Sequence, residues 1–149
     1  MLSPAGGVSR FSRAQGAGVG SAYDRALAEL RAGRKRSHWI WFVLPQLAGL
    51  GRSAMAQRYG LDGLGEARAY LAHPLLRQRL EQVIDVIHHQ LQHPGQTLER
   101  LMGGELDATK TISSLTLFEA AGLASATTLL NHLGRRCAWT QTQLNTQNW

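Results

Sequence analysis

The sequence predicts an all-α fold, organised as a compact single-domain bundle of about six to eight short helices. Its 149 residues fit one domain, and a hydrophobic fraction of 44% is ordinary for a chain that buries its own core. Several segments repeat apolar residues every three or four positions, as helices do. No segment alternates polar and apolar residues with the β-branched enrichment that is typical of strands.

The N-terminal segment differs in composition from the rest of the chain. Glycine, serine and alanine dominate 1–20, so we expect this segment to be loosely ordered, apart from a short helical start at 11–15. Three glycines that follow this start would interrupt a longer helix. We therefore expect a single helical domain over 21–149.

The first helices of this domain have recognisable ends. Ser21 can cap a helix that runs through Arg31, because a serine oxygen accepts a hydrogen bond from a free amide of the first turn. Gly33 suits the end of this helix. Ser37 can cap the next segment, 38–44, which is almost wholly apolar. We favour a helix there, because nothing nearby offers strand partners.

Further helices are expected along the rest of the chain. The longest begins at His73-Pro74, since proline is favoured at the first helical position. Asp107 can cap another that continues through Ala121. The core-facing stripe of the longest helix is Leu76, Leu80, Val83, Ile84, Ile87 and Leu91. The remaining segments are 53–59, 64–71, 97–102, 125–133 and a tail at 135–149 that is either a terminal helix or a docked segment.

The composition excludes several classes of protein. A single cysteine, Cys137, rules out an internal disulfide and a thiolate zinc site, and it fits a reducing compartment. No apolar stretch approaches the length of a membrane span, and the N-terminus lacks the apolar core of a secretory signal. We expect a basic, cytoplasmic protein of bacterial type, with no cofactor, no metal and no membrane partner. His89 and His93 have ligand spacing, but Pro94 breaks the helix there.

The first candidate motif is the basic-aromatic run from Gly33 to Gln46. Three cations stand before an expected helix start, whose free amides attract anions, and tryptophan rings can stack on a flat ligand. The alternative is that the aromatic residues belong to the core and the cations to a solvated turn. The candidate residues in this run are Arg34, Lys35, Arg36, His38, Trp39, Trp41 and Gln46.

A second motif, 49–53, combines two glycines with Ser53 at a helix start. Glycines allow a backbone to approach a ligand closely, so this segment is a further candidate anion seat. It is not a Walker loop, because the lysine and the spacing are missing.

The third motif lies in the helix that begins near Asp107. Asp107, Lys110 and Ser114 are three and four residues apart and share one face, with Ser113 beside them. The aspartate and the lysine could exchange protons or neutralise each other. A helix cap with surface hydroxyls is the alternative.

The motifs occur in an order that is specific to a family. They begin with Tyr23, Ala26-Leu27, Glu29-Leu30, Gly33-Arg34-Lys35, Ser37-His38-Trp39-Ile40-Trp41-Phe42, Pro45-Gln46, Gly49-Leu50-Gly51, Ser53, Ala56 and Tyr59. They continue with Glu66-Ala67, Tyr70-Leu71, His73-Pro74, Arg79-Leu80, Asp107, Lys110, Ser113-Ser114 and Thr116-Leu117-Phe118. From residue 11 onward, the chain resembles the bacterial domain-of-unknown-function family 1810. This resemblance implies an all-helical domain of about this length and no established activity.

Together the motifs suggest a site that binds or processes a phosphorylated small molecule, a class that includes nucleotide derivatives. In this site Arg34, Lys35 and Arg36 would bind the phosphate, and Trp39 and Trp41 would form the wall. The groups that could transfer protons are His38, Asp107 and Lys110. The remaining ligand-binding residues, which would orient the ligand, are Gln46, Ser53, Ser113 and Ser114. The net charge of +6 supports a nucleic-acid-binding module as the alternative, and a structural or partner-binding helical protein is the third possibility. The sequence leaves open the ligand, any reaction and the oligomeric state.

Overall fold

The computed structural model describes residues 7–147, and this part of the chain is mostly helical and contains no strand. Its helices are α1 (Ser9–Gln15), α2 (Ala22–Arg31), α3 (Ile40–Val43), α4 (Ala54–Tyr59), α5 (Leu64–Ala72), α6 (Pro74–Gln90), α7 (Leu98–Leu101), α8 (Glu105–Ala120), α9 (Ala124–Leu133) and α10 (Ala138–Gln147). The expected all-α class is confirmed. Ten helices in this range exceed the predicted six to eight, because every expected segment forms a helix of its own, even the short α1, α3, α4 and α7.

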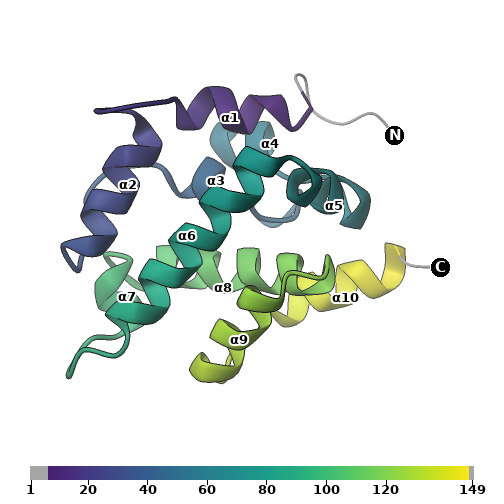
Figure 1. Ribbon diagram of the computed structural model, residues 1–149. Helices are drawn as coiled ribbons and strands as arrows, with labels where there is room; N and C mark the ends of the chain where they lie inside the picture. The colour runs from purple at the N-terminus through teal and green to yellow at the C-terminus, as the bar shows by residue number, and fades with distance from the viewer. Residues whose placement is uncertain (1–6, 148–149) are drawn as a thin grey trace.

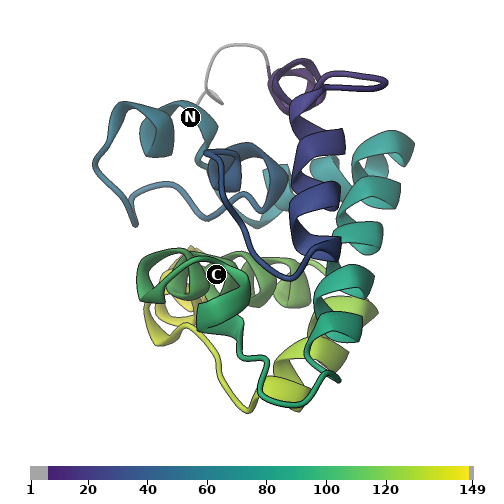
Figure 2. The same ribbon diagram turned by 90° about the vertical axis from the view of Figure 1, so that its left-hand side faces the viewer.

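Two long helices organise the molecule. Figure 1 shows α6 crossing the fold diagonally, and it packs against α2, α5 and α9. Helix α8 packs against α9, α10, α5, α7 and α3, so it touches segments from both halves of the chain. Figure 2 shows the connection between α2 and α3 passing close to the end of the fold where α7 lies. This arrangement brings the basic-aromatic run and the start of α8 to one place.

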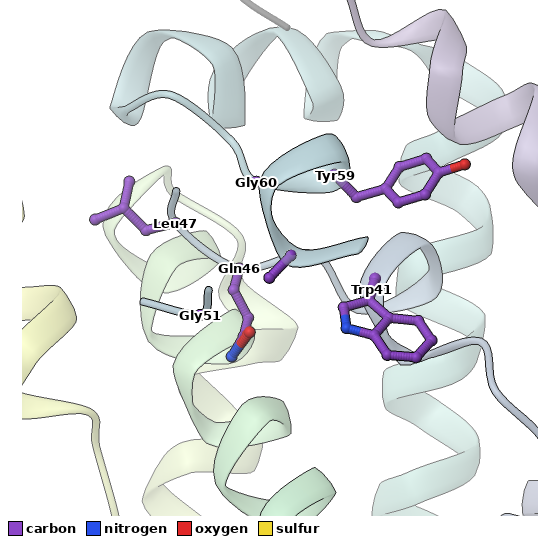
Figure 3. Close-up of a pocket in the computed structure, with 7 residues that line it drawn as sticks. Trp41, Gln46, Leu47, Gly51, Tyr59 and Gly60 are labelled. Atoms are coloured by element: carbon purple, nitrogen blue, oxygen red, sulfur yellow. The ribbon is translucent and has the colours of Figure 1, made fainter. Parts of the chain in front are cut away.

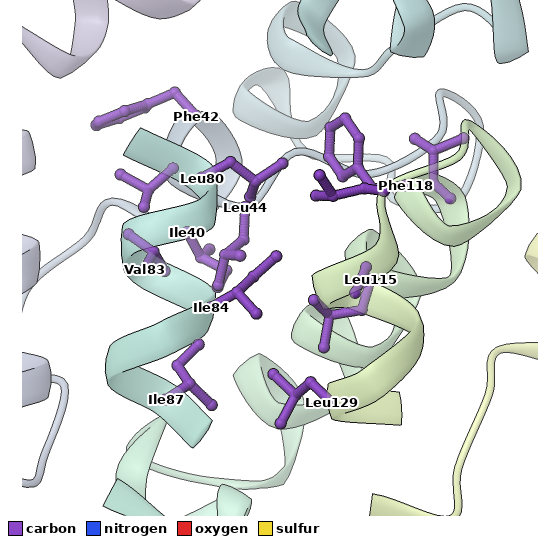
Figure 4. Packing of buried hydrophobic residues seen from close by; sticks show 14 of the residues in the cluster. Ile40, Phe42, Leu44, Leu80, Val83, Ile84, Ile87, Leu115, Phe118 and Leu129 are labelled. Carbon is purple, nitrogen blue, oxygen red and sulfur yellow. The ribbon is translucent and has the colours of Figure 1, made fainter. Parts of the chain in front are cut away.

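The core lies between α3, α6, α8 and α9. The stripe predicted for α6 is buried from Leu76 to Ile87, whereas Leu91 at its end is half-buried. The segment expected at 38–44 does contain a helix, α3, and its Ile40 is 2% exposed. Figure 4 shows these core side chains, among them Leu80, Val83, Ile84 and Ile87 of α6, Leu115 and Phe118 of α8, and Leu129 of α9.

An ion pair with almost no exposure fastens α1 to the fold. Arg10 donates from Nη1 to Glu66 at 3.1 Å, and both side chains are 4% exposed. Arg10 also donates to the carbonyl oxygens of Arg58 and Gly60, and its guanidinium group lies over the ring of Phe11, which is fully buried. The division of the chain at residue 20 stays a prediction, and positions 1–6 lie outside the described residues.

Several helices begin with a side-chain cap, and the one expected at Ser21 is among them. The caps of α2, α4 and α6 accept amide hydrogen bonds through Ser21, Ser53 and His73. Two expected caps are wrong. Trp39 stands at the start of α3, while Ser37 donates its hydroxyl to Glu29 instead. Helix α8 begins after Gly104, so Asp107 lies within the first turn.

Candidate functional site

Two lysines share one carboxylate where the first and third motifs meet. The Nζ atom of Lys35 lies 2.8 Å from Oδ2 of Asp107, and the Nζ atom of Lys110 lies 3.9 Å from Oδ1. The side chains of Lys35, Asp107 and Lys110 are 6%, 22% and 23% exposed. We call these three residues the lysine–aspartate cluster. With two ammonium groups and one carboxylate it has an excess positive charge, and its partial burial limits screening by salt.

The backbone holds Lys35 in this position. Its amide donates to the carbonyl oxygen of Leu101 at 2.7 Å, and its ammonium group donates to the carbonyl oxygen of Ser37 at 2.6 Å. Gly103 lies so close that a Cβ atom there would come within 3.0 Å of the Lys35 carbonyl oxygen. The segment before α3 is thus fixed against the turn between α7 and α8.

Each lysine of the cluster lies over an indole ring. The Nζ atom of Lys35 is 5.0 Å from the ring centroid of Trp39, and that of Lys110 is 5.2 Å from the ring centroid of Trp41. Trp39 is only 1% exposed, so its ring belongs to the core and is not open to a ligand. Trp41 is half-buried and lies at the border between core and surface.

Glu29 organises the basic-aromatic run and was missed as a site residue. Its Oε1 accepts from the amides of Arg36 and Ser37, at 2.8 and 3.0 Å, and from the indole N–H of Trp39 at 2.9 Å. Its other oxygen accepts from the Ser37 hydroxyl. Glu29 occurs in the family-like order of motifs, but no local spacing links a residue of α2 to the run that follows it.

Acid should release this network. Burial by itself raises the pKa of Glu29, but the hydrogen bonds from Ser37, Arg36 and Trp39 outweigh it and lower the pKa from 4.5 to about 2. Because the pKa is lower in the folded state, the stabilisation is complete above pH 4.5 and is lost as the pH falls toward 2. We expect the stability advantage of the wild type over Glu29→Gln to shrink across this window, measured by urea unfolding at a series of pH values. An advantage that is independent of pH would contradict this.

Two buried polar atoms near the cluster have no hydrogen-bond partner among the described residues. They are Nε1 of Trp41 and the hydroxyl oxygen of Ser114, whose residue is fully buried. Ser114 lies one turn beyond Lys110 on α8, on the same face. An unpaired buried polar group costs stability, so such groups are typical of sites that a ligand or ordered water completes.

Trp41 lines a small cavity. Its volume is about 10 Å³, enough for one water-sized group. Figure 3 shows the indole nitrogen on the side of the ring that faces Gln46. The backbone of Gln46 is held in place, because its main-chain carbonyl oxygen accepts from the amide of Leu61 at 2.9 Å. We call this space the Trp41 cavity; its lining residues are Trp41, Gln46, Leu47, Gly51, Ala56, Tyr59 and Gly60.

Other predicted site residues lie away from the cluster. The side chains of Arg34, Arg36 and His38 are exposed and make no hydrogen bond or ion pair within the described part of the chain. Arg34 lines a separate groove of about 630 Å³ with Arg100. Ser53 is exposed and caps α4.

Ser113 faces a different neighbour, Cys137 at the start of α10. Its hydroxyl donates to the carbonyl oxygen of Thr109. Burial raises the pKa of Cys137, but hydrogen bonds from Ser113, Thr140 and amides of the helix start outweigh this and lower it below its ordinary value. Ser113 therefore belongs to the contact between α8 and α10.

No group of three or more histidine, cysteine, aspartate or glutamate side chains in 7–147 could hold a metal ion. The ring of His88 of α6 instead packs at a tilt of 47° against that of His132 of α9, with ring centroids 5.0 Å apart. Among the helices described, none has the length and apolar character needed to cross a membrane.

The fold and the cluster together define a small helical domain with a half-buried basic site. The chain belongs to the family DUF1810, described as a protein of unknown function, whose family model matches residues 6–144. The resemblance seen in the sequence is thereby confirmed. The chain is also similar to the crystal structure of the conserved hypothetical protein Rv1873 from Mycobacterium tuberculosis, with 41% identity and a TM-score of 0.82 over 93% of this chain and 96% of that chain. Comparison with curated proteins gives no match.

Proposed function

We propose that this protein binds a phosphorylated small molecule at the lysine–aspartate cluster. The observation that carries the proposal is the sharing of Asp107 by Lys35 and Lys110, which leaves the cluster with more positive than negative charge. A phosphate would neutralise that excess through charge-assisted hydrogen bonds. The unpaired hydroxyl of Ser114 supports the same conclusion, because a phosphate oxygen could accept its proton.

The two lysines have different parts in this proposal. Lys110 is the more exposed and the more weakly paired, at 3.9 Å from Asp107, so it is the group that meets the ligand. Lys35 is almost buried and holds Asp107 in place at 2.8 Å. Both oxygens of Asp107 face ammonium groups, so this carboxylate already has partners within the fold. The arrangement therefore supports binding more directly than acid–base catalysis.

Removing the Lys110 charge is expected to weaken phosphate binding about tenfold, since a hydrogen bond to a charged group contributes about 1.5 kcal/mol or more. The variant is Lys110→Met, and binding is measured by calorimetry and thermal shift with inorganic phosphate, pyrophosphate and adenosine monophosphate. Arg68→Met is the matched control, because Arg68 is an exposed cation of α5 with no ion pair within the described residues.

The proposal fails if none of these phosphates raises the melting temperature of the wild type, or if Lys110→Met binds them as the wild type does. A short RNA oligonucleotide belongs in the same screen, because the exposed Arg34 and Arg36 are also suited to a nucleic-acid backbone. Salt-sensitive RNA binding that Lys110→Met leaves unchanged would favour the nucleic-acid alternative. Circular dichroism of each variant checks that the helices are intact.

A further inference from the structure

We infer that the Trp41 cavity is a subsite that selects phosphate compounds carrying a second, neutral oxygen, either carbonyl or hydroxyl, near the phosphate. The inference rests on the proposed function, because it places the phosphate at Lys110. Its independent support is the buried N–H of Trp41, which is on the side of the ring that faces Gln46, another lining residue, and has no partner among the described residues. A ligand oxygen would supply the acceptor that this N–H needs.

The chemistry of the lining residues determines what the cavity can accept. Trp41 offers a donor only, and the amide of Gln46 offers both a donor and an acceptor. No charged side chain lines the space. An anionic group there would lose its hydration without gaining a counter-charge, which is costly. A carbonyl oxygen could accept from both residues, and a hydroxyl could accept from Trp41 while donating to Gln46.

The size of the cavity limits the group to a single oxygen. At about 10 Å³ it has room for one water-sized group and not for a ring or a phosphate. A Cβ atom at Gly51 would come within 2.8 Å of the Ala56 side chain, and one at Gly60 within 2.8 Å of the Ala48 backbone. The glycines thus keep this small space open.

The position of the cavity links it to the phosphate site. The Lys110 ammonium lies 5.2 Å from the centroid of the indole ring of Trp41, which lines the cavity. A phosphate bound to Lys110 would therefore place its first carbon atoms along the edge of Trp41. The subsite would form hydrogen bonds with an oxygen atom attached to those carbons.

Three probes of equal chain length test the inference: dihydroxyacetone phosphate with a carbonyl, glycerol 3-phosphate with hydroxyls, and propyl phosphate with neither. We expect the wild type to bind at least one of the first two about threefold to tenfold more tightly than propyl phosphate, the contribution of one added hydrogen bond. Trp41→Phe, which keeps an aromatic ring but loses the N–H, should bind all three nearly equally. Gln46→Leu is the second variant and should reduce the same preference.

The indole signal of Trp41 gives a direct readout of the predicted hydrogen bond. The chain has four tryptophans, so a nitrogen-15 spectrum separates the indole N–H groups, and the peak missing in Trp41→Phe identifies Trp41. We expect this peak to move with the preferred probe and much less with propyl phosphate. If the probes bind through Lys110 but without preference, or with the Trp41 peak unmoved, the subsite is refuted and the phosphate site stands. If no probe binds, the phosphate site fails, and the subsite with it.

Discussion

Replacing Glu66 with leucine is expected to lower the free energy of unfolding by about 3 to 5 kcal/mol, the cost of leaving a buried charge without its partner. Arg10 would lose its carboxylate while its side chain stays 4% exposed. The amide of Asp62, which donates to Glu66 at 3.1 Å, would lose this acceptor. Urea unfolding monitored by circular dichroism gives the free energy. A loss below about 1 kcal/mol, the scale of exposed ion pairs, would contradict the burial of this pair.

The double variant Arg10→Met with Glu66→Leu is the control for this prediction. It removes both charges, so it should be more stable than Glu66→Leu alone. The carbonyl oxygens of Arg58 and Gly60 would still lose their donor, so recovery should be incomplete. With the Arg10→Met single variant it completes a cycle that isolates the pair energy. Strictly additive losses would show that the two side chains do not interact.

Replacing Glu29 with alanine should have the second largest effect, about 2 to 3 kcal/mol, because the backbone amides of Arg36 and Ser37 and the indole N–H of Trp39 would lose one shared acceptor. The indole N–H of Trp39 should contribute most to this loss, because Trp39 is 1% exposed and water cannot easily replace the missing acceptor. Urea unfolding measures the loss. Tryptophan fluorescence should shift at the same time, as the surroundings of the Trp39 indole change.

Glu29→Gln separates geometry from charge. The amide oxygen can take the place of Oε1 and keep its three hydrogen bonds, and the amide nitrogen can donate to the Ser37 hydroxyl, which can turn to accept. We expect a loss smaller than that of Glu29→Ala, made up of the contribution of the negative charge that the low pKa of Glu29 reflects. A loss as large as that of Glu29→Ala would mean that the negative charge, and not the set of hydrogen bonds, holds the run in place.

Local signals in the sequence were sufficient for most of the fold. The repeat along α6 predicts the buried face from Leu76 to Ile87, because every third or fourth residue of a helix faces the same neighbour. Ser21 and Ser53 cap helices as expected, since their oxygens have no stronger partner. The predicted count of six to eight was too low because each expected segment forms a helix of its own, including the short ones at α3 and α7 that tertiary contacts support.

The exceptions are side chains with a partner far away in the sequence. Ser37 and Asp107 are residue types that often cap helices. Here Ser37 donates its hydroxyl to Glu29 instead, and Asp107 forms an ion pair with Lys35. Sequence spacing identified both members of the Lys35–Asp107 pair as candidates without stating that they pair. It also could not separate Trp39 from Trp41, whose indole groups have different surroundings: the N–H of Trp39 donates to Glu29, whereas that of Trp41 has no partner among the described residues. Such differences depend on how the chain folds back, which local pattern does not encode.

The shared carboxylate of Asp107 has a thermodynamic consequence. The contact with Lys35 fastens the segment before α3, and the contact with Lys110 lies at the proposed ligand position. A ligand that draws Lys110 away from Asp107 would leave that carboxylate to Lys35 alone. Anchoring of the segment before α3 and binding of the ligand would then be thermodynamically coupled. If the ligand multiplies the equilibrium constant for anchoring by some factor, anchoring multiplies the affinity for the ligand by the same factor.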